Sequence, residues 1–229
     1  MKGNKVFLAV AIILLSVLIV MSVGCGSKET VPVDLTEETG AEMETPTGVF
    51  FGPGLHMVNI DIEPGRYRAA GNVIYWARLS DTLGATTYGE SDLSLREKVE
   101  FIIVNGAPLA GPVIVDIDSS DVAFESVGDG LWILIDKTYQ PEIKTTFGDG
   151  VWLVGIDIEP GTYQTKDDLL FFQRLSNFSH EADGWIDISF DNITVEGGTT
   201  VVIEPTDVGF QTVGGTMSGS KEAIWTKID

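Results

Sequence analysis

Hydrophobic and polar positions divide this 229-residue chain into three regions. Residues 6–23 form an unbroken uncharged run, residues 26–48 are polar and acidic, and from residue 50 short apolar runs alternate with polar residues. A period of two is typical of strands with one buried face. Short strands about 8–12 residues apart, separated by Gly and Pro, predict an all-β chain of the sandwich or jelly-roll class.

The apolar runs of each half give the expected strands. In the first half they are 73–79, 99–104, 112–117, 122–126 and 131–135, and in the second they are 169–175, 185–190, 200–204 and 208–212. The alternation in 58–62 and 154–158 predicts a further strand at each place.

The chain contains one sequence unit twice. "NIDIEPGRY" (59–67) returns as "GIDIEPGTY" (155–163), and residues 51–80 agree with residues 147–176 at 14 of 30 positions. After a ten-residue shortening the match continues to Trp132 and Trp225. We therefore predict two tandem homologous β domains at 50–136 and 147–229, with a connector at 137–146. Each unit is long enough to own a core.

Each copy of the repeated stretch carries a Pro-Gly pair, Pro64-Gly65 and Pro160-Gly161. Pro presets φ for the second position of a turn, and Gly accepts the positive φ that a type II turn needs next. These four residues predict a structural turn and no chemistry.

The N-terminus has the order of a secretory signal, with Lys2 and Lys5 before the apolar run. Cys25, the single cysteine, follows Val23-Gly24. This order resembles the lipobox of bacterial lipoproteins, which implies that residues 1–24 are removed and Cys25 is acylated. Ser22 departs from the Leu, Val or Ile usual at that place. The alternative is an uncleaved anchor helix, because about 20 apolar residues span a bilayer.

Residues 25–49 read as a tether. Six acids oppose one lysine in 26–48 and no aromatic occurs there, so the stretch cannot bury enough apolar surface to order itself. Without residues 1–24 the chain has 12 basic and 34 acidic residues, a net charge of about −22. That charge argues against nucleic acid and against anionic lipid surfaces. The lone cysteine excludes an intrachain disulfide.

"GDGVWLVGIDIEPGTY", the aromatic pair before "RLS" and a late "GDG-x-W" resemble a module of secreted proteins and lipoproteins of Gram-positive bacteria. The resemblance implies a β module with no established molecular activity. That module typically carries a cysteine pair, whose places correspond here to Ile74 and Asp129, with Leu170 in the second copy. The resemblance therefore implies that any disulfide of the family is absent here.

Residues with catalytic or metal-binding potential are sparse. His56 and His180 are the two histidines, and neither lies in a zinc or serine-hydrolase pattern. We predict no catalytic residues, no cofactor and no metal site. A weak Ca²⁺ site at Asp116, Asp118 and Asp121 is the alternative to a solvated strand face.

An aromatic residue and an arginine share a strand face in both copies: Trp76 with Arg78, and Phe172 with Arg174. Such a pair can form a cation–π contact or a binding surface. The alternative is packing of the arginine stem over the aromatic ring.

These patterns favour a lipid-anchored module on the extracytoplasmic face of the cell membrane. We expect it to be non-catalytic and to bind an envelope protein or glycan, with no nucleic acid. A structural envelope protein without a specific ligand is the first alternative, and an enzyme acting on glycans is the second.

Overall fold

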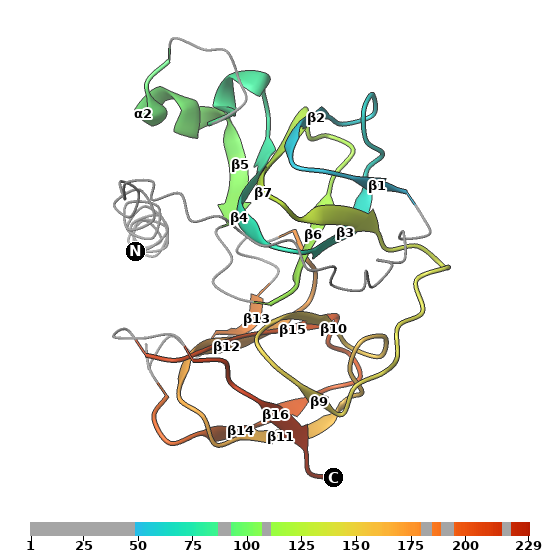
Figure 1. The fold of residues 1–229 in the computed structure, drawn as a ribbon, viewed down its shortest axis with the longest axis vertical. Helices are drawn as coiled ribbons and strands as arrows, with labels where there is room; N and C mark the ends of the chain where they lie inside the picture. Colours follow the sequence, from blue (N-terminus) through green and yellow to red (C-terminus); the bar gives the residue numbers. More distant parts are fainter. Residues whose placement is uncertain (1–48, 87–92, 107–110, 180–184, 189–194, 217–220) are drawn as a thin grey trace, which may run out of the picture. The chain divides into compact units, whose positions relative to one another are not determined.

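The computed structural model describes residues 49–86, 93–106, 111–179, 185–188, 195–216 and 221–229. Cys25, the tether residues 26–48 and His180 lie outside these ranges. Residues from Gly48 onward belong to one compact unit, whose strands run from blue to green in the first repeat and from yellow to red in the second (Figure 1). The prediction of an all-β chain with two tandem domains is confirmed.

The first repeat is a sandwich of two antiparallel sheets. In spatial order, one sheet consists of β1 (Phe50–Phe51), β8 (Leu131–Leu134), β3 (Gly65–Ala70) and β6 (Val113–Ile117). The other consists of β2 (Gly54–Met57), β7 (Ala123–Gly128), β4 (Val73–Leu79) and β5 (Ile102–Gly106). Between β4 and β5 lie the 3-10 turn η1 (Thr82–Gly84), the helix α2 (Leu95–Lys98) and the 3-10 turn η2 (Val99–Phe101).

The second repeat has the same strand order. One sheet consists of β9 (Thr146–Phe147), β16 (Trp225–Lys227), β11 (Gly161–Thr165) and β14 (Thr199–Ile203). The other consists of β10 (Gly150–Leu153), β15 (Gly209–Gly214), β12 (Leu169–Leu175) and β13 (Trp185–Ile188). Because the two orders correspond strand by strand, residues in the strands of one repeat have structural counterparts in the strands of the other.

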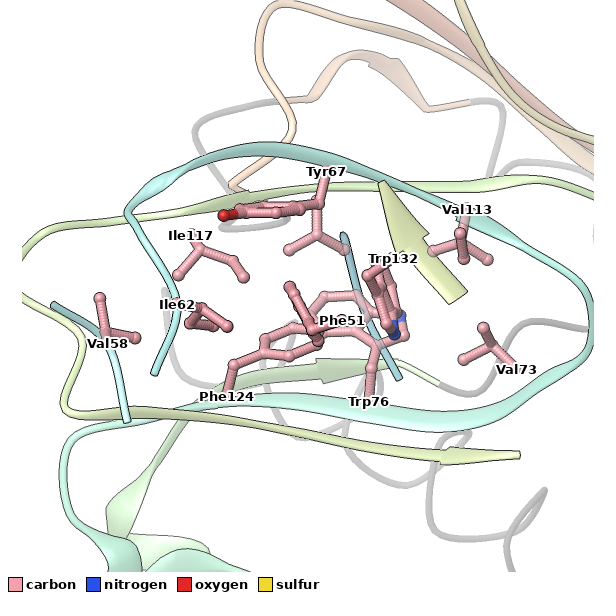
Figure 2. Packing of buried hydrophobic residues seen from close by; sticks show 12 residues of the cluster. Phe51, Val58, Ile62, Tyr67, Val73, Trp76, Val113, Ile117, Phe124 and Trp132 are labelled. Carbon is pink, nitrogen blue, oxygen red and sulfur yellow. The ribbon is translucent and has the colours of Figure 1, made fainter. Parts of the chain in front are cut away.

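Large aromatic side chains fill the space between the sheets of each repeat. Figure 2 shows Trp132, Tyr67, Phe124 and Trp76 pointing into the first core. Burial of a Trp is stable when its N–H finds a partner. The Nε1–H of Trp132 donates to Ser126 Oγ at 2.8 Å, and the counterpart Trp225 donates to Thr212 Oγ1 at 3.0 Å.

The strands predicted at 58–62 and 154–158 are wrong, because both stretches form tight turns. The N–H of Asp61 donates to the carbonyl of Met57 at 2.8 Å, and that of Asp157 donates to Leu153 at 2.9 Å. Asn59 has φ 66° and its counterpart Gly155 has φ 77°, so the turn needs a left-handed residue there. Ile60 is consequently 78% exposed.

The predicted type II turn is also wrong. Gly65 and Gly161 have φ of 159° and 151°, whereas a type II turn needs about 80° at that position. Each glycine instead opens a strand at a close approach. A Cβ on Gly65 would lie 2.8 Å from Leu134 Cδ1, and one on Gly161 would lie 2.7 Å from Asp229 Oδ1. Pro64 and Pro160 immediately precede these strands.

Candidate functional site

The predicted aromatic–arginine surface does not fit the burial of its residues. Trp76 is 2% exposed and lies in the first core, stacked on Phe124 at 6.3 Å between ring centroids (Figure 2). Arg78 is 4% exposed. Phe172 is partly buried and its ring contacts those of Phe210 and Trp225. Trp76 and Phe172 thus pack in the interiors of the two sandwiches and not on a solvent-facing surface.

Both arginines make the same ion pair in their own repeat. Arg78 donates from Nε and Nη2 to the two carboxylate oxygens of Asp121, at 2.7 and 2.9 Å. Arg174 donates in the same way to Asp207, at 2.6 and 2.8 Å. A two-pronged pair between buried groups fixes geometry strongly. Its presence in both copies indicates a structural role.

The acids considered for Ca²⁺ have other partners. Asp116 accepts from Arg66 Nε and Nη2 at 2.6 and 2.9 Å, and Asp121 pairs with Arg78. Asp118 accepts from the N–H of Ser120 at 2.8 Å, a bond that lowers the pKa of its carboxyl. Among the described residues, no group of three or more His, Cys, Asp or Glu side chains could hold a metal ion.

The two repeats contact each other through apolar side chains, backbone hydrogen bonds and an ion pair. The apolar part of this contact joins Ile114, Ile135 and Tyr139, which precede the second repeat, to Val151, Leu153, Leu175, Phe178 and Val208. Backbone bonds cross the same contact: Asp116 N–H donates to Phe178 O, and Val151 N–H to Pro112 O, both at 2.8 Å. The outer face of β3 and β6 therefore covers the second repeat's β10–β15–β12–β13 sheet.

Asp157 is the polar centre of this contact. Its Oδ2 accepts from Arg68 Nη1 at 2.5 Å and from the N–H of Leu153 at 2.9 Å, and its Oδ1 accepts from the Tyr139 hydroxyl at 2.9 Å. The Arg68 guanidinium also lies over the Trp152 ring, 5.3 Å from the centroid. Burial raises the pKa of Tyr139 to about 12. The Arg68 guanidinium therefore makes an ion pair with the Asp157 carboxylate and a cation–π contact with the Trp152 ring.

Arg66 supports the same contact beside its ion pair with Asp116. Its guanidinium carbon lies 4.6 Å from the centre of the Phe178 ring. Arg66 and Arg68 are two positions apart on β3, so both point outward from the sandwich whereas Tyr67, between them, is fully buried.

The corresponding face of the second repeat is open. Register places Thr162, Gln164, Thr200 and Val202 where the first repeat has Arg66, Arg68, Ile114 and Asp116. We call this the open face and define it by Thr146, Thr162, Gln164, Thr200, Val202, Thr226 and Ile228. Val202 is 49% and Ile228 56% exposed. Within the described part of the chain, no domain covers this face of the second repeat, whereas the counterpart face of the first repeat makes a domain contact.

A buried polar group lies on the outer face of the β2–β7–β4–β5 sheet. Glu125 is fully buried and its Oε2 accepts from the N–H and the hydroxyl of Thr86, at 2.8 and 3.0 Å. Lys98 Nζ donates to Ala85 O at 2.7 Å. Burial raises the pKa of the Tyr75 hydroxyl, on the same sheet, to about 12. These contacts hold the segment between β4 and β5 onto the sheet.

Sequence reasoning missed Arg66, Arg68 and Asp157. A signal was available in the difference between the copies, because strand positions with alternate arginines in one repeat hold Thr162 and Gln164 in the other. When the same strand face is charged in one repeat and neutral in the other, the two faces are expected to have different neighbours in the structure.

The chain belongs to the family of the Rv1352-like extracellular domain, whose model matches residues 48–133 and 144–217. The two matched segments correspond to the two repeats, so the domain is present twice. The chain is therefore a bacterial-type extracellular protein built from a tandem repeat of one β module.

Curated relatives resemble part of the chain. They are uncharacterized proteins of Mycobacterium tuberculosis (strain H37Rv) and Mycobacterium bovis, each 43% identical over 79 residues. The match covers 28% of this chain and 62% of each relative, so the chain spans about six tenths of their length. No solved structure matches.

Where the structure describes the chain, it contains no helix of sufficient length and apolarity to traverse a bilayer.

Proposed function

We propose that this protein is a lipid-anchored, extracytoplasmic and non-catalytic interaction module that contacts an envelope protein or glycan through the open face of its second repeat. One observation carries the proposal. The outer face of β3 and β6 binds a folded domain, and the counterpart face on β11 and β14 is exposed.

The open face has the chemistry of a binding surface. Register aligns Thr146, Thr226, Gln164 and Thr200 in one row across all four strands. Hydroxyl and amide groups both donate and accept hydrogen bonds, which suits a polar partner such as a glycan or a polar protein surface. Val202, Ile224 and Ile228 add exposed apolar area beside this row. Such a mixture is typical of interfaces that form reversibly.

The proposed anchor would present this face outside the cell. The family is extracellular, and the order of basic residues, apolar run and Gly24-Cys25 supports acylation of Cys25. Residues 26–48 would then separate the folded unit from the membrane. A structural envelope protein that only packs and spaces is the competing function, and it requires no partner at the open face.

Site-specific photo-crosslinking in the native cell separates these functions. A photoreactive residue at Thr226 or Thr200 should yield a defined adduct, and the same residue at the exposed Glu142 of the connector should not. A spacer without a ligand predicts no adduct at any of the three positions, or the same diffuse pattern at all of them. Either result would overturn the proposed function.

A further inference from the structure

The contact between the repeats contains a complete site for an arginine side chain. The Trp152 ring and the Asp157 carboxylate of the second repeat receive Arg68 of the first. Two bonds within the second repeat hold this site: Trp152 Nε1–H donates to Gly148 O at 2.9 Å, and Leu153 N–H donates to Asp157 Oδ2 at 2.9 Å. The ring and the carboxylate are therefore positioned by their own repeat.

The first repeat has the same framework. His56 stands in place of Trp152, and its Nε2 lies 2.9 Å from Gly52 O, the counterpart of Gly148 O. Because a carbonyl oxygen only accepts, Nε2 carries the hydrogen. Asp61 is the counterpart of Asp157, and its Oδ2 accepts from the N–H of Met57 at 2.8 Å. Aromatic ring and carboxylate are thus held by equivalent bonds in both repeats.

We propose that His56 and Asp61 form a binding site for an arginine side chain of a partner protein. Asp61 is exposed, and Ile60 beside it is 78% exposed. Val122, whose counterpart Val208 packs in the contact between the repeats, is 37% exposed. The ring, the carboxylate and one apolar residue of this docking surface are thus present on the first repeat. The remaining apolar counterparts, Leu55, Met57 and Leu79, pack against Ala85 of the segment between β4 and β5. This site lies on the other repeat from the open face, so the inference goes beyond the proposed function.

Arginine fits this site better than lysine does. A planar guanidinium can stack on a ring and pair with a carboxylate at the same time, as Arg68 does. A lysine ammonium would make the ion pair alone.

The arginine comes from a different protein and not from a second copy of this chain. Of the five arginines in the sequence, the four whose side chains the structure describes each pair with an aspartate of the same chain, and the side chain of Arg96 lies outside the described part. If a second copy repeated the contact between the repeats, its open face would have to supply the arginine. That face holds Thr162 and Gln164 in place of Arg66 and Arg68. The acidic chain, with a formal net charge of −20, favours a basic partner in addition.

Peptide binding to the full-length protein in detergent micelles tests the site. The probe is a blocked hexapeptide with the sequence of residues 65–70, which carries arginine at alternate positions. Matched peptides carry lysine or neutral citrulline in place of both arginines. Binding is measured by calorimetry at about 0.15 M salt, where distant charges are screened.

Three variants separate the site from general charge attraction. Asp61→Asn keeps an oxygen for the Met57 N–H and removes the charge, and it should weaken binding of the arginine peptide about fivefold. Glu63→Gln removes the same charge two positions away and should change binding less than about twofold. His56→Trp copies the second repeat and should strengthen binding about threefold, because Trp is the better cation–π acceptor.

The results that would overturn the site are equally specific. Equal binding of the arginine and lysine peptides would show that net charge alone attracts the peptide. Equal weakening of binding by Asp61→Asn and Glu63→Gln would show the same. Absence of binding to His56→Trp would also overturn it, since that variant holds the complete ring and carboxylate. Concentration-dependent self-association of the wild type, lost in Asp61→Asn, would show the occupant to be a second copy. None of these outcomes bears on the crosslinks at the open face.

Discussion

Arg68 Nη1 and Asp157 Oδ2 lie 2.5 Å apart, although the two residues belong to different repeats and are 89 positions apart in the chain. The Asp157 side chain is 2% exposed and that of Arg68 is 17% exposed. An ion pair in such surroundings binds the repeats to each other, because separating them would leave a carboxylate without its cation. We therefore expect the two homologous domains to unfold as one cooperative unit.

Arg68→Ala should destabilise this unit by about 3 kcal/mol, since it leaves the buried Asp157 without its charge partner. Urea unfolding followed by tryptophan fluorescence measures the loss. Lys221→Ala is the matched control, because Lys221 also pairs with an aspartate, Asp167, but its side chain is 79% exposed. That change should cost much less than Arg68→Ala does, because solvent screens an exposed ion pair. Similar losses in both variants would show that the contact between the repeats adds little stability.

Stability at alkaline pH should depend on Tyr139. Burial raises the pKa of its hydroxyl from 10.0 to about 12, so the stability from this group is present below pH 10 and is lost as pH rises towards 12. Ionisation would place a phenolate beside the Asp157 carboxylate. The free-energy advantage of the wild type over Tyr139→Phe should therefore shrink from pH 9 to pH 12. A constant difference would mean that the hydroxyl does not titrate with the fold.

The sequence predicted strands well where apolar residues are continuous. The predictions at 73–79 and 169–175 match β4 and β12 residue for residue. Apart from Ile74, every residue of these two strands is buried or partly buried, which explains why their apolar residues do not simply alternate with polar ones. The stretch 58–62 alternates like a strand but forms a turn. Alternation over five residues does not reveal the left-handed residue at Asn59 that bends the chain.

The candidate binding surface failed for a related reason. Period two correctly implies that Trp76 and Arg78 share a face of β4, but it does not say whether that face meets solvent. In the structure Trp76 faces the core, and Ala77 and Leu79 on the opposite face are also fully buried. Contacts between domains depend on residues that are far apart in sequence. In a single sequence they can be detected only where equivalent positions of the two repeats hold different residues, as Arg68 and Gln164 do.

The repeated turn gives a matched test of backbone conformation. Gly155 has φ 77°, and no atom lies within 4 Å of a Cβ built on it, so substitutions there test conformation without a clash. Gly155→Ala should destabilise the protein by about 1 kcal/mol, the cost of a left-handed L-residue. Gly155→Asn, which copies Asn59 of the first repeat, should cost less because Asn tolerates that conformation. Thermal unfolding compares the two, and equal midpoints would show that the turn adopts another conformation in solution.

Acylation of Cys25 is tested by the mass of the N-terminus, because location alone cannot distinguish the two anchors. A lipoprotein precursor whose Cys25 is changed to Ala keeps residues 1–24, and that apolar segment would still hold it on the membrane. The wild type extracted from membranes should instead begin at Cys25 and carry the added mass of its acyl chains. Cys25→Ala should begin at or near Met1 and lack that mass. If the wild type also begins at Met1 without added mass, the protein is held by an uncleaved helix, and the tether begins at that helix and not at a lipid.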